Sequence, residues 1–474
     1  MNESRPGPAA TQPTPIAGRR ALVMGLGTFG GGLGAVHWLV QQGAQVTVTD
    51  LNGEERLGAS LQQLAELDVE LVLGQHREQE FRAADLIVAN PAVPTTSPWL
   101  ELGRSAGAQV TSEVELFLER VRGTVLAVTG TQGKSSTVSM THQLLALTGK
   151  PAHLGGNIGG SLLEQLASIQ TGNPVVMELS SYQLEALPRR TWPTAVTAIG
   201  VTNILADHLE RHGCEEAYGA AKARILDLAG PATRILVPGT CTLLRNHIGT
   251  PEAQGRALFH GSLGEGADAT AEPALRVENG RFRLKTEDLG ALADLSVPGS
   301  FQANNALVAL GLARIHGVPA RTLRRFVSRL RGLPHRLEDL GRYGGLRVID
   351  NGVSTTPDST QAVLGDVERG ASLLIGGKAK RLCMENLLDT ARSRDLRVFA
   401  FGAAGQDLER AFDSRGLRVT KHETLDDAVV AAFATTEAGG TLLFSPACAS
   451  FDAYTNFRER AESFRALLPD AETD

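Results

Sequence analysis

The sequence predicts an α/β protein built on parallel β-sheets, and three observations support this fold class. Short runs of β-branched and aliphatic residues alternate with segments of helical spacing along the whole chain. Such alternation is typical of parallel sheets covered by helices on both faces. Much of the glycine lies where a predicted strand turns into a helix. The length of 474 residues is enough for about three domains of roughly 150 residues each.

The predicted strands are spread over the whole chain. The clearest are, in order, ALVMGL, AQVTVTD, DLIVANP, TVLAVTG, PVVMELS, TAVTAIGVTN, LRVIDNG, SLLIGG, LRVFAFG and TLLFSPA. Residues 260–295 are polar and rich in turn-forming residues, so we expect hairpins there.

Composition shifts divide the chain into a tail and three blocks. Residues 1–17 are rich in Pro, Ala and Thr and lack the apolar core of a signal peptide, so we expect a disordered tail. We expect domains at 18–120, 121–332 and 333–474. The segment GLPHR carries the glycine and proline of a linker between the last two domains.

Charge, hydropathy and cysteine content exclude several classes of protein. The chain has 46 Lys and Arg against 52 Asp and Glu, whereas nucleic-acid-binding proteins usually have a basic excess. No run of about 18 apolar residues is present, so we expect no membrane span. The four cysteines lack paired spacing, which favours free thiols in a reducing cytoplasm over a disulfide framework. We therefore expect a cytoplasmic protein with no nucleic-acid or membrane partner.

The segment AVTGTQGKSSTVSM, residues 127–140, predicts a phosphate-binding loop. A predicted strand precedes it and a predicted helix follows, so backbone N–H groups and the helix N-terminus would surround anionic oxygens. We expect Lys134 to reach nucleotide phosphates and Ser135 or Ser136 to hold Mg²⁺. The alternative is a simple glycine turn with an exposed lysine. Val128 stands where most P-loop hydrolases have a further glycine.

Acidic and basic residues follow the next predicted strands. Glu178 ends PVVMELS, where a second-strand carboxylate can bind the metal of a phosphate site. Asn203, Asp207 and His208 follow the next strand, and Lys222 lies on a helical segment downstream. The Asp-His pair alone could be only a helix cap. Together with the loop and Glu178 it favours a metal-and-substrate site.

The N-terminal block begins with a strand, a glycine-rich turn, a helix and a strand that ends at Asp50. Alone, the turn from Gly25 to Gly30 with an acidic residue about 20 positions later matches a dinucleotide fingerprint. A nicotinamide-dependent dehydrogenase is therefore an alternative. That alternative leaves the GKSS loop, the Asp-His pair and Lys222 unexplained.

Together these motifs resemble the Mur ligases, the ATP-dependent amino-acid ligases of peptidoglycan synthesis. The resemblance covers nearly the whole chain past the tail. TGTQGKSS resembles the family's T-G-[ST]-N-G-K-[ST]-[ST], with Gln132 where Asn is usual. GGNIG, ANPAVP, ELSSYQL, DHLERH, GLPHRLE and LLIGGKAK resemble further family segments. SPACASFDAYTNF resembles S-P-A-C-A-S-x-D-x-[FY]-x-N-F, the signature of the members that add D-glutamate.

The resemblance implies a role for each matching position. Catalytic roles are implied for Lys134, His208 and Lys222, which the family carbamylates. ATP contacts are implied for Gly130, Thr131, Gln132, Gly133, Lys134, Ser135, Ser136, Asn305, Arg336 and Asn351. Two Mg²⁺ sites are implied, with ligands from Ser135, Glu178, His208 and carbamylated Lys222. Contacts to the UDP-substrate are implied for Gly27, Thr28, Asp50, Asn90, Asn157 and Ser180. Contacts to D-glutamate are implied for Thr355, Lys380, Ser450 and Phe457.

The resemblance also implies the architecture and the reaction. The N-terminal domain would be Rossmann-like and bind the UDP-substrate, the central one P-loop ATPase-like, and the C-terminal one Rossmann-like and bind the amino acid. The implied reaction is ATP-dependent ligation of D-glutamate to UDP-N-acetylmuramoyl-L-alanine through an acyl phosphate, catalysed by a cytoplasmic monomer. A Mur-type ligase for another amino acid and a non-catalytic relative remain alternatives.

Two segments depart from the family pattern. NGVSTTP stands where the family has D-S-K-A-T-N, so Asn351, Gly352 and Val353 replace Asp, Ser and Lys. Asn351 can still form a hydrogen bond with a ribose hydroxyl. Without the negative charge of Asp, this hydrogen bond is weaker by about 1 kcal/mol. Val353 cannot bind a phosphate or carboxylate. In GSFQANNA, Phe301 and Gln302 replace His and Asn. These departures are the reason for considering a non-catalytic relative.

Overall fold

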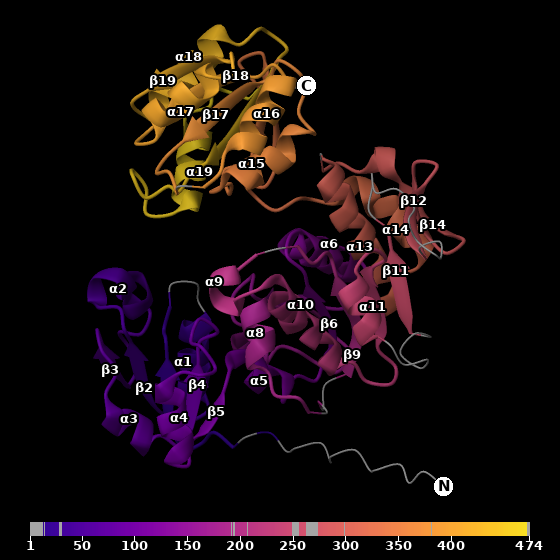
Figure 1. The fold of residues 1–474 in the computed structure, drawn as a ribbon. Helices are drawn as coiled ribbons and strands as arrows, with labels where there is room; N and C mark the ends of the chain where they lie inside the picture. The colour runs from indigo at the N-terminus through magenta and orange to yellow at the C-terminus, as the bar shows by residue number, and fades with distance from the viewer. Residues whose placement is uncertain are drawn as a thin grey trace. The chain divides into compact units, whose positions relative to one another are not determined.

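The computed structural model describes residues 13, 15–27, 31–190, 192, 195–205, 207–248, 256–261, 274–297, 299–380 and 382–471. Its strands form three sheets, each largely parallel, which confirms the predicted α/β class (Figure 1). Contacts divide the chain into two compact units, Met1–Asp294 with Asn304–Val327, and Leu295–Ala303 with Ser328–Asp474. The first unit contains two sheets and the second contains one. The division into three domains at the stated boundaries stays a prediction.

The N-terminal sheet is wholly parallel, with strand order β3-β2-β1-β4-β5. Its strands are β1 (Arg20–Met24), β2 (Gln45–Asp50), β3 (Val69–Leu73), β4 (Leu86–Ala89) and β5 (Gln109–Thr111). Its helices are α1 (Gly31–Gln41), α2 (Glu54–Gln62), α3 (Glu78–Ala83), α4 (Pro98–Ser105) and α5 (Glu113–Leu118). The strand order reverses between β1 and β4, and ligands bind such sheets beyond the carboxyl ends of the strands at this switch point.

The central sheet has the order β14-β13-β12-β11-β10-β9-β6-β8-β7. Its strands are β6 (Thr124–Thr129), β7 (His153–Gly156), β8 (Pro174–Glu178), β9 (Ala195–Val201), β10 (Arg234–Pro238), β11 (Ala257–His260), β12 (Leu275–Glu278), β13 (Arg281–Leu284) and β14 (Glu287–Ala291). The last three strands pair antiparallel, as expected of the hairpin-rich segment. Because β6 lies between β8 and β9 in parallel register, the residues that follow these three strands share one edge.

Helices and short 3-10 turns cover this sheet. They are α6 (Lys134–Ala146), α7 (Leu162–Gln165), α8 (Ser181–Ala186), α9 (Leu209–His212), α10 (Glu215–Ala223), η1 (Arg224–Leu228), α11 (Thr242–His247), η2 (Leu292–Asp294), α13 (Ser300–His316), α14 (Ala320–Phe326) and η3 (Val327–Arg329). A cluster of buried apolar side chains runs from α1 and β1 through α5 to β6 and β8. Ile16, within the predicted tail, is 7% exposed and belongs to this cluster, so packed chain begins before Gly18.

The C-terminal sheet has the order β15-β16-β20-β17-β18-β19, with only the edge strand β15 antiparallel. Its strands are β15 (Glu338–Tyr343), β16 (Leu346–Asp350), β17 (Ser372–Gly376), β18 (Arg397–Phe401), β19 (Arg418–His422) and β20 (Thr441–Ala447). Its helices are α15 (Pro357–Leu364), α16 (Glu385–Ser393), α17 (Gly405–Asp413), α18 (Leu425–Thr435) and α19 (Phe457–Ala466). The strands β16, β20 and β17 are neighbours, so the loops at their carboxyl ends lie side by side.

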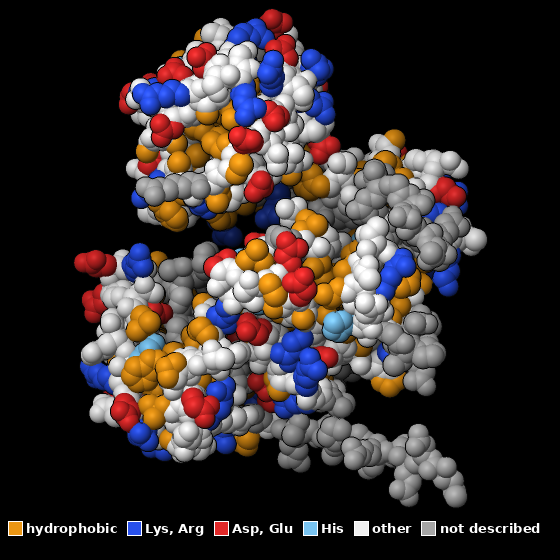
Figure 2. All heavy atoms as spheres, in the orientation of Figure 1, with side chains coloured by type: hydrophobic (Ala, Val, Ile, Leu, Met, Phe, Trp, Pro, Cys, Tyr) orange, Lys and Arg blue, Asp and Glu red, His pale blue; other side chains and the backbone are white. Residues whose placement is uncertain are grey.

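The surface carries both charge signs. In Figure 2, Lys and Arg side chains are interspersed with Asp and Glu side chains over the visible face. Within the described part of the chain, no helix has the length and apolar character needed to span a membrane.

Candidate active site

The glycine-rich turn after β1 is held by Asp50, the last residue of β2. The Oδ2 atom of Asp50 accepts hydrogen bonds from the backbone nitrogens of Leu26 at 2.9 Å and Gly27 at 3.4 Å. Its Oδ1 atom accepts from the backbone and side-chain nitrogens of Asn52. Asp50 therefore shapes the turn, and its predicted contact with the UDP-substrate stays a prediction.

Asn90, directly after β4, closes the same turn. Its Nδ2 atom donates to the carbonyl oxygen of Gly25 at 3.3 Å. A Cβ atom on Gly25 would lie 2.8 Å from the Cβ of Asn90, and Gly25 has φ +89°. The structure therefore brings Gly27, Asp50 and Asn90 together at the switch point. Thr28, predicted beside them, lies outside the described residues.

The phosphate loop connects β6 to α6 and depends on two glycines. Gly130 has φ 151° and Gly133 has φ 78°, a region that favours glycine. A Cβ atom would lie 1.9 Å from Oγ1 of Thr202 at the first position and 2.0 Å from Oδ1 of Asn305 at the second. The loop therefore needs both glycines, and the structure places Asn305, a predicted ATP contact, against it.

Asn203, which follows β9, fixes the phosphate loop from its other side. Its Oδ1 atom accepts from the backbone nitrogens of Thr131 at 3.2 Å and Gln132 at 2.9 Å. Its Nδ2 atom donates to the carbonyl oxygen of Gln132 at 3.2 Å. Asn203 was expected at this strand end beside Asp207 and His208, and its amide serves two peptide groups of the loop at once. Lys134 donates from Nζ to the carbonyl oxygen of Thr131 at 2.8 Å.

Glu178 is a buried carboxylate at the end of β8, with 1% of its surface exposed. Its Oε1 atom accepts from Nδ2 of Asn157 at 3.0 Å, and its carbonyl oxygen accepts from the backbone nitrogen of Asn157 at 2.9 Å. Its Oε2 atom is buried with no hydrogen-bond partner among the described residues. Burial of such an oxygen is costly unless a ligand provides a partner. The geometry joins the predicted metal ligand Glu178 to the predicted substrate contact Asn157.

Ser180 and His208 occupy the starts of neighbouring helices. The Oγ atom of Ser180 accepts from the backbone nitrogen of Gln183 at 3.2 Å and caps α8. His208 has φ 50°, its side chain is 46% exposed, and its Nδ1 atom lies 3.4 Å from the Tyr182 hydroxyl. The Nδ1 atom also lies 3.4 Å from Oε1 of Glu210, and Nε2 lies 3.6 Å from Oδ2 of Asp207, so a ligand at His208 would replace these long contacts.

Lys222 is the buried cation of this site, with 2% of its surface exposed. Its Nζ atom donates to the carbonyl oxygen of Gly130 at 2.7 Å and lies 4.7 Å from the centre of the Tyr218 ring. Burial lowers the pKa of Lys222 to about 7, and the nearby charge of Lys134 lowers it as well. An amine with this pKa is largely neutral just above pH 7 and can react as a nucleophile.

The predicted metal ligands fit Mg²⁺ held jointly with phosphate oxygens. In the described ranges, no three His, Cys, Asp or Glu side chains gather closely enough to hold a metal by themselves. Two buried oxygens, Oε2 of Glu178 and Oγ of Ser136, lack hydrogen-bond partners there. Mg²⁺ prefers oxygen ligands and is usually bound by one or two carboxylates with water and substrate phosphates. The donor set therefore suits this ion.

Arg211 joins this region to the predicted substrate loop ANPAVP. Its Nη1 and Nη2 atoms donate to the carbonyl oxygens of Ala92 at 3.1 Å and Val93 at 3.4 Å. Its Nε atom donates to Glu185 at 3.2 Å, and its guanidinium lies 4.9 Å from the Tyr182 ring centre. Arg211 is not marked by any motif, because nothing in one sequence shows which loops an arginine would connect.

Three of the predicted D-glutamate contacts lie on adjacent loops of the second unit. Thr355 follows β16, Lys380 follows β17 and Ser450 follows β20. The Nζ atom of Lys380 donates to Oγ1 of Thr355 at 3.2 Å. Phe457, the fourth predicted contact, begins α19. The structure therefore brings the first three positions to one edge of the sheet.

Asn351 and Gly352 have internal roles in this unit. Asn351 is 3% exposed, donates from Nδ2 to Oγ of Ser445 at 3.0 Å, and accepts at Oδ1 from the backbone nitrogen of Leu337 at 3.2 Å. A Cβ atom on Gly352 would lie 2.6 Å from the Cβ of Ala461 on α19. The close approach of α19 explains a glycine where the family has serine. The predicted contact of Asn351 with ATP stays a prediction.

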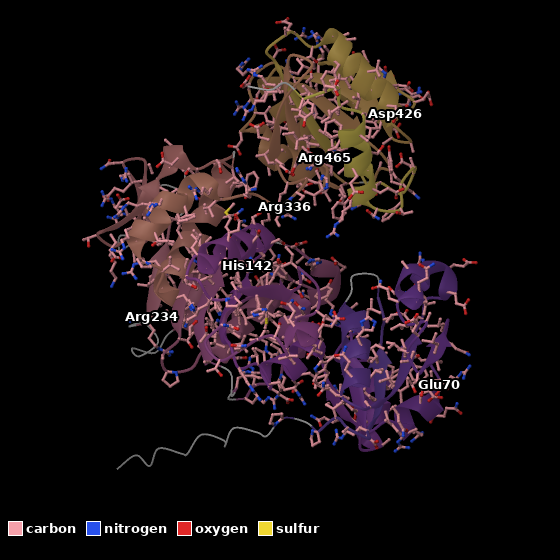
Figure 3. The ribbon with its side chains drawn as sticks, turned by 180° about the vertical axis from the view of Figure 1, so that it is seen from behind. Glu70, His142, Arg234, Arg336, Asp426 and Arg465 are labelled. Carbon is pink, nitrogen blue, oxygen red and sulfur yellow. The ribbon has the colours of Figure 1, made fainter. Side chains whose placement is uncertain are left out.

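The remaining departures lie in the same unit. Gln302 is fully buried and donates from Nε2 to the carbonyl oxygen of Arg336 at 3.3 Å; Figure 3 shows Arg336. Phe301 packs against the core of the C-terminal sheet. Val353 donates from its backbone nitrogen to the carbonyl oxygen of His335 at 3.1 Å. Gln302 thus supports the segment that carries Arg336, a predicted ATP contact.

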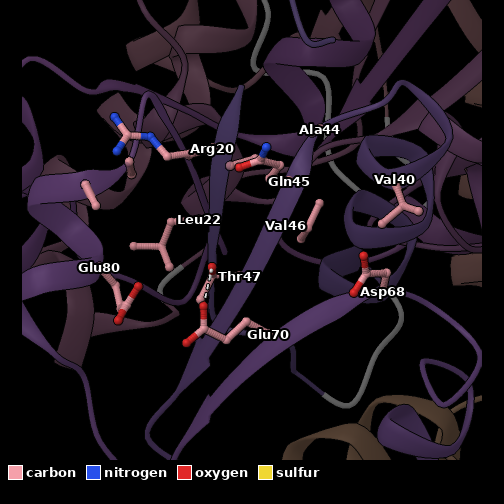
Figure 4. A pocket seen from close by; sticks show the side chains of 13 residues that line it. Arg20, Leu22, Val40, Ala44, Gln45, Val46, Thr47, Asp68, Glu70 and Glu80 are labelled. Atoms are coloured by element: carbon pink, nitrogen blue, oxygen red, sulfur yellow. Dashed lines mark hydrogen bonds between the residues drawn. The ribbon is translucent and has the colours of Figure 1, made fainter. Parts of the chain in front are cut away.

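A hollow of about 460 Å³ lies at the opposite edge of the N-terminal sheet, near the amino ends of β1 and β2 (Figure 4). Its lining includes Arg20, Thr47, Asp68, Glu70 and Glu80. It includes none of the predicted site residues. Parallel sheets bind ligands at the carboxyl ends of their strands, so this hollow is separate from the site described above.

Models of two protein families match this chain. The Mur ligase middle domain matches residues 128–313, and the N-terminal domain of MurD-like Mur ligases matches residues 19–112. A UDP-N-acetylmuramoylalanine–D-glutamate ligase of Roseiflexus sp. strain RS-1 is 35% identical over 467 residues, 96% of this chain and 99% of the relative. A ligase of the same name from Geobacter metallireducens is 33% identical over 460 residues, 96% of this chain and 98% of the relative.

Solved structures show the same fold at lower identity. The UDP-N-acetylmuramate–alanine ligase of Thermotoga maritima has a TM-score of 0.59 and 18% identity, over 94% of this chain and 98% of that one. MurF of Acinetobacter baumannii has a TM-score of 0.59 and 14% identity, over 94% and 92%. The expected architecture of the resembled family is thereby confirmed. The full-length relatives and the geometry of the phosphate loop lead to one conclusion: this chain belongs to the Mur ligase family.

Proposed function

We propose that this chain is an ATP-dependent carbon–nitrogen ligase that joins D-glutamate to UDP-N-acetylmuramoyl-L-alanine in peptidoglycan precursor synthesis. One structural observation carries the proposal. A phosphate loop, a buried carboxylate with an unpartnered oxygen and a buried lysine of lowered pKa meet where β6, β8 and β9 end. The curated full-length relatives are named for this substrate pair.

The reaction needs ATP because a carboxylate is a poor electrophile. Transfer of the γ-phosphoryl group to an oxygen of the L-alanyl carboxylate forms an acyl phosphate and releases ADP. The amine of D-glutamate, after losing a proton, attacks the carbonyl carbon. The tetrahedral intermediate collapses to the amide and expels phosphate, which carries the carboxylate oxygen away. The protein contributes positioning and charge stabilisation.

Residues of the first unit have separate roles in phosphate binding and in orienting the carboxylate. The loop N–H groups that do not donate to Asn203 are left for the nucleotide phosphates, and the ammonium of Lys134 can turn to them from the Thr131 carbonyl oxygen. Asn203 and Thr202 hold the loop in shape, because both bond to the Gln132 carbonyl oxygen. Asn157 orients the Glu178 carboxylate. Thr202, Asn203 and Asn157 already form these bonds before the substrates bind, so the loop and the carboxylate need little reorganisation.

We further propose that Ser135, Glu178, His208 and a carbamate on Lys222 hold Mg²⁺ at two sites. When bound, Mg²⁺ neutralises charge on the phosphoryl oxygens. The carbamate forms when the neutral Nζ amine attacks CO₂ and releases a proton. The lowered pKa of Lys222 supports this modification, because it supplies the neutral amine near pH 7. Since both nucleotide substrates belong to the cytoplasm, we place the reaction there.

Phosphate release tests the function. Purified protein with Mg²⁺-ATP and UDP-N-acetylmuramoyl-L-alanine is assayed with D-glutamate, L-glutamate, D-lysine or no amino acid. We expect release with D-glutamate alone, and its loss in Lys134→Ala. Release that prefers another amino acid would indicate a different Mur-type specificity. No release with any amino acid, despite binding of the UDP-substrate, would indicate a non-catalytic relative.

A further inference from the structure

The largest fully buried side chain of the described residues is a cation, Arg460 of α19, with 0% of its surface exposed. None of the described carboxylates forms an ion pair with it. Its Nη1 atom donates to the carbonyl oxygens of Cys448 at 2.9 Å and Gly376 at 3.3 Å, and its Nη2 atom donates to that of Ser354 at 3.3 Å. A buried charge usually has a carboxylate partner. Here backbone oxygens of three separate loops take that place.

These three loops carry the predicted D-glutamate contacts. Ser354 precedes Thr355, Gly376 lies four residues before Lys380, and Cys448 lies two residues before Ser450. The fourth predicted contact, Phe457, lies one helical turn before Arg460 on α19. The guanidinium therefore donates hydrogen bonds to three of these segments, and the fourth is the start of its own helix. Removing it would release each loop from a shared anchor.

Gly377 leaves room for the guanidinium of Arg460 between the loops. Gly377 has φ +123°, and a Cβ atom there would lie 2.9 Å from Nη1 of Arg460 and 2.4 Å from the carbonyl oxygen of Ala449. Backbone hydrogen bonds between Lys378 and Ala449, at 2.8 and 3.0 Å, tie two of the loops together beside it. A larger residue at Gly377 would separate the loops that Arg460 holds.

The charge of Arg460 also has a consequence for the ligand. Burial lowers the pKa of Arg460 to about 10, so the guanidinium stays protonated at neutral pH. D-Glutamate brings two carboxylates and one ammonium group, a net negative charge. Asp452 acts on this charge through space but forms no ion pair with it, and the buried cation adds positive potential to the loops that would receive the ligand.

We propose that Arg460 is a positioning residue for the amino-acid substrate: it fixes the loops after β16, β17 and β20 in the arrangement that receives D-glutamate. The inference rests on the proposed function. Arg460 donates to loop carbonyls and does not touch the reacting atoms. Its loss should therefore raise KM for D-glutamate while leaving KM for ATP and for the UDP-substrate unchanged.

The test uses Arg460→Met and Arg460→Lys in the full chain. We expect KM for D-glutamate to rise at least about tenfold in Arg460→Met. Arg460→Lys, which keeps the charge but has fewer donors, should show a smaller rise. The exchange of labelled ADP into ATP with the UDP-substrate and no amino acid reports the first half-reaction alone, and it should stay within about twofold of wild type.

A matched control separates positioning from folding. Phe464 lies on the same helix, is fully buried and stacks on Phe444 with ring centres 4.2 Å apart. Phe464→Leu should lower Tm without raising KM for D-glutamate selectively. An unchanged D-glutamate KM in both Arg460 variants, or an equal rise of all three KM values, would overturn the inference. Failure of the proposed function would give a different result: the wild-type enzyme would release no additional phosphate when D-glutamate is added.

Discussion

The Nζ atom of Lys222 donates a hydrogen bond to the carbonyl oxygen of Gly130 at 2.7 Å, so the buried lysine of α10 is attached to the phosphate loop. This contact places an amine of lowered pKa beside the nucleotide site. It also explains why a helix residue distant in sequence from the loop belongs to the same site.

Carbamylation of Lys222 should make activity depend on CO₂. Only the neutral amine reacts with CO₂, and the pKa of Lys222 is lowered to about 7. At a fixed concentration of dissolved CO₂, the activity that CO₂-depleted enzyme recovers should increase as the pH rises through about 7 and then level off. Lys222→Arg should be inactive at every pH, because its guanidinium stays protonated. Full activity of Lys222→Arg would contradict the role.

Asn203→Ala should weaken ATP binding, because the phosphate loop loses three hydrogen bonds from one side chain. At roughly 1 kcal/mol per bond, and with water replacing some of them, we expect KM for ATP to rise about five- to thirtyfold. Asn203→Asp should raise KM for ATP further, since it adds a negative charge beside the phosphates. Thr197→Val, on strand β9 that precedes Asn203, is the matched control. ATP kinetics unchanged in Asn203→Ala would show that the loop holds its shape without this residue.

Glu113→Gln should stabilise the protein at alkaline pH. Burial raises the pKa of Glu113 from 4.5 to about 7, and its Oε1 atom accepts from Oγ of Ser161 at 2.5 Å. Because the folded state binds this proton more tightly than the unfolded state, wild-type stability falls as the pH rises from 4.5 through 7. Gln cannot ionise, so the variant should gain about 1–3 kcal/mol at pH 8 and almost nothing at pH 4.

Denaturant unfolding at both pH values measures the effect. Glu164→Gln provides the comparison, because Glu164 is 43% exposed and pairs with His37 at 2.9 Å. It should show a much smaller change with pH. Equal pH dependence in wild type and Glu113→Gln would contradict a raised pKa for this partly buried carboxyl.

Gly352→Ser, which restores the family residue, should destabilise the second unit. A Cβ atom there would lie 2.6 Å from the Cβ of Ala461, so a side chain displaces α19 at a cost of about 1–3 kcal/mol. Ala461→Gly alone should cost about 1 kcal/mol through helix propensity. The double variant should be more stable than the sum of the two changes predicts. Additive effects, measured by thermal unfolding, would show that the two positions do not oppose each other.

Much of the fold could be predicted from the sequence because its strands are buried on both faces and read as apolar runs. The segments TVLAVTG and PVVMELS contain β6 and β8. The glycine turns lie where positive φ angles are needed. Short edge strands such as Val69–Leu73 and Arg418–His422 were not singled out, because they mix charged and apolar residues. Their pairing depends on neighbours that local sequence does not reveal.

The chemical residues of the site could be named from motifs, but their supports could not. Lys134, Glu178 and Lys222 lie in recognisable patterns. Asn203 could be named as a strand-end residue, but its bonds to the phosphate loop could not be predicted. Arg460 could not be named, because it acts through bonds to backbone atoms that no sequence motif marks. The same is true of Gly352, whose absent side chain is explained only by the approach of α19.

Ligation through an acyl phosphate moves one oxygen of the alanyl carboxylate into the released phosphate, and this transfer can be measured. UDP-N-acetylmuramoyl-L-alanine labelled with ¹⁸O in the alanyl carboxylate is incubated with the enzyme, Mg²⁺-ATP and D-glutamate, and the released phosphate is analysed by mass spectrometry. We expect one ¹⁸O atom in each phosphate, together with an amide product that contains D-glutamate. Phosphate without the label would show that water attacks ATP directly, and it would contradict ligation through an acyl phosphate.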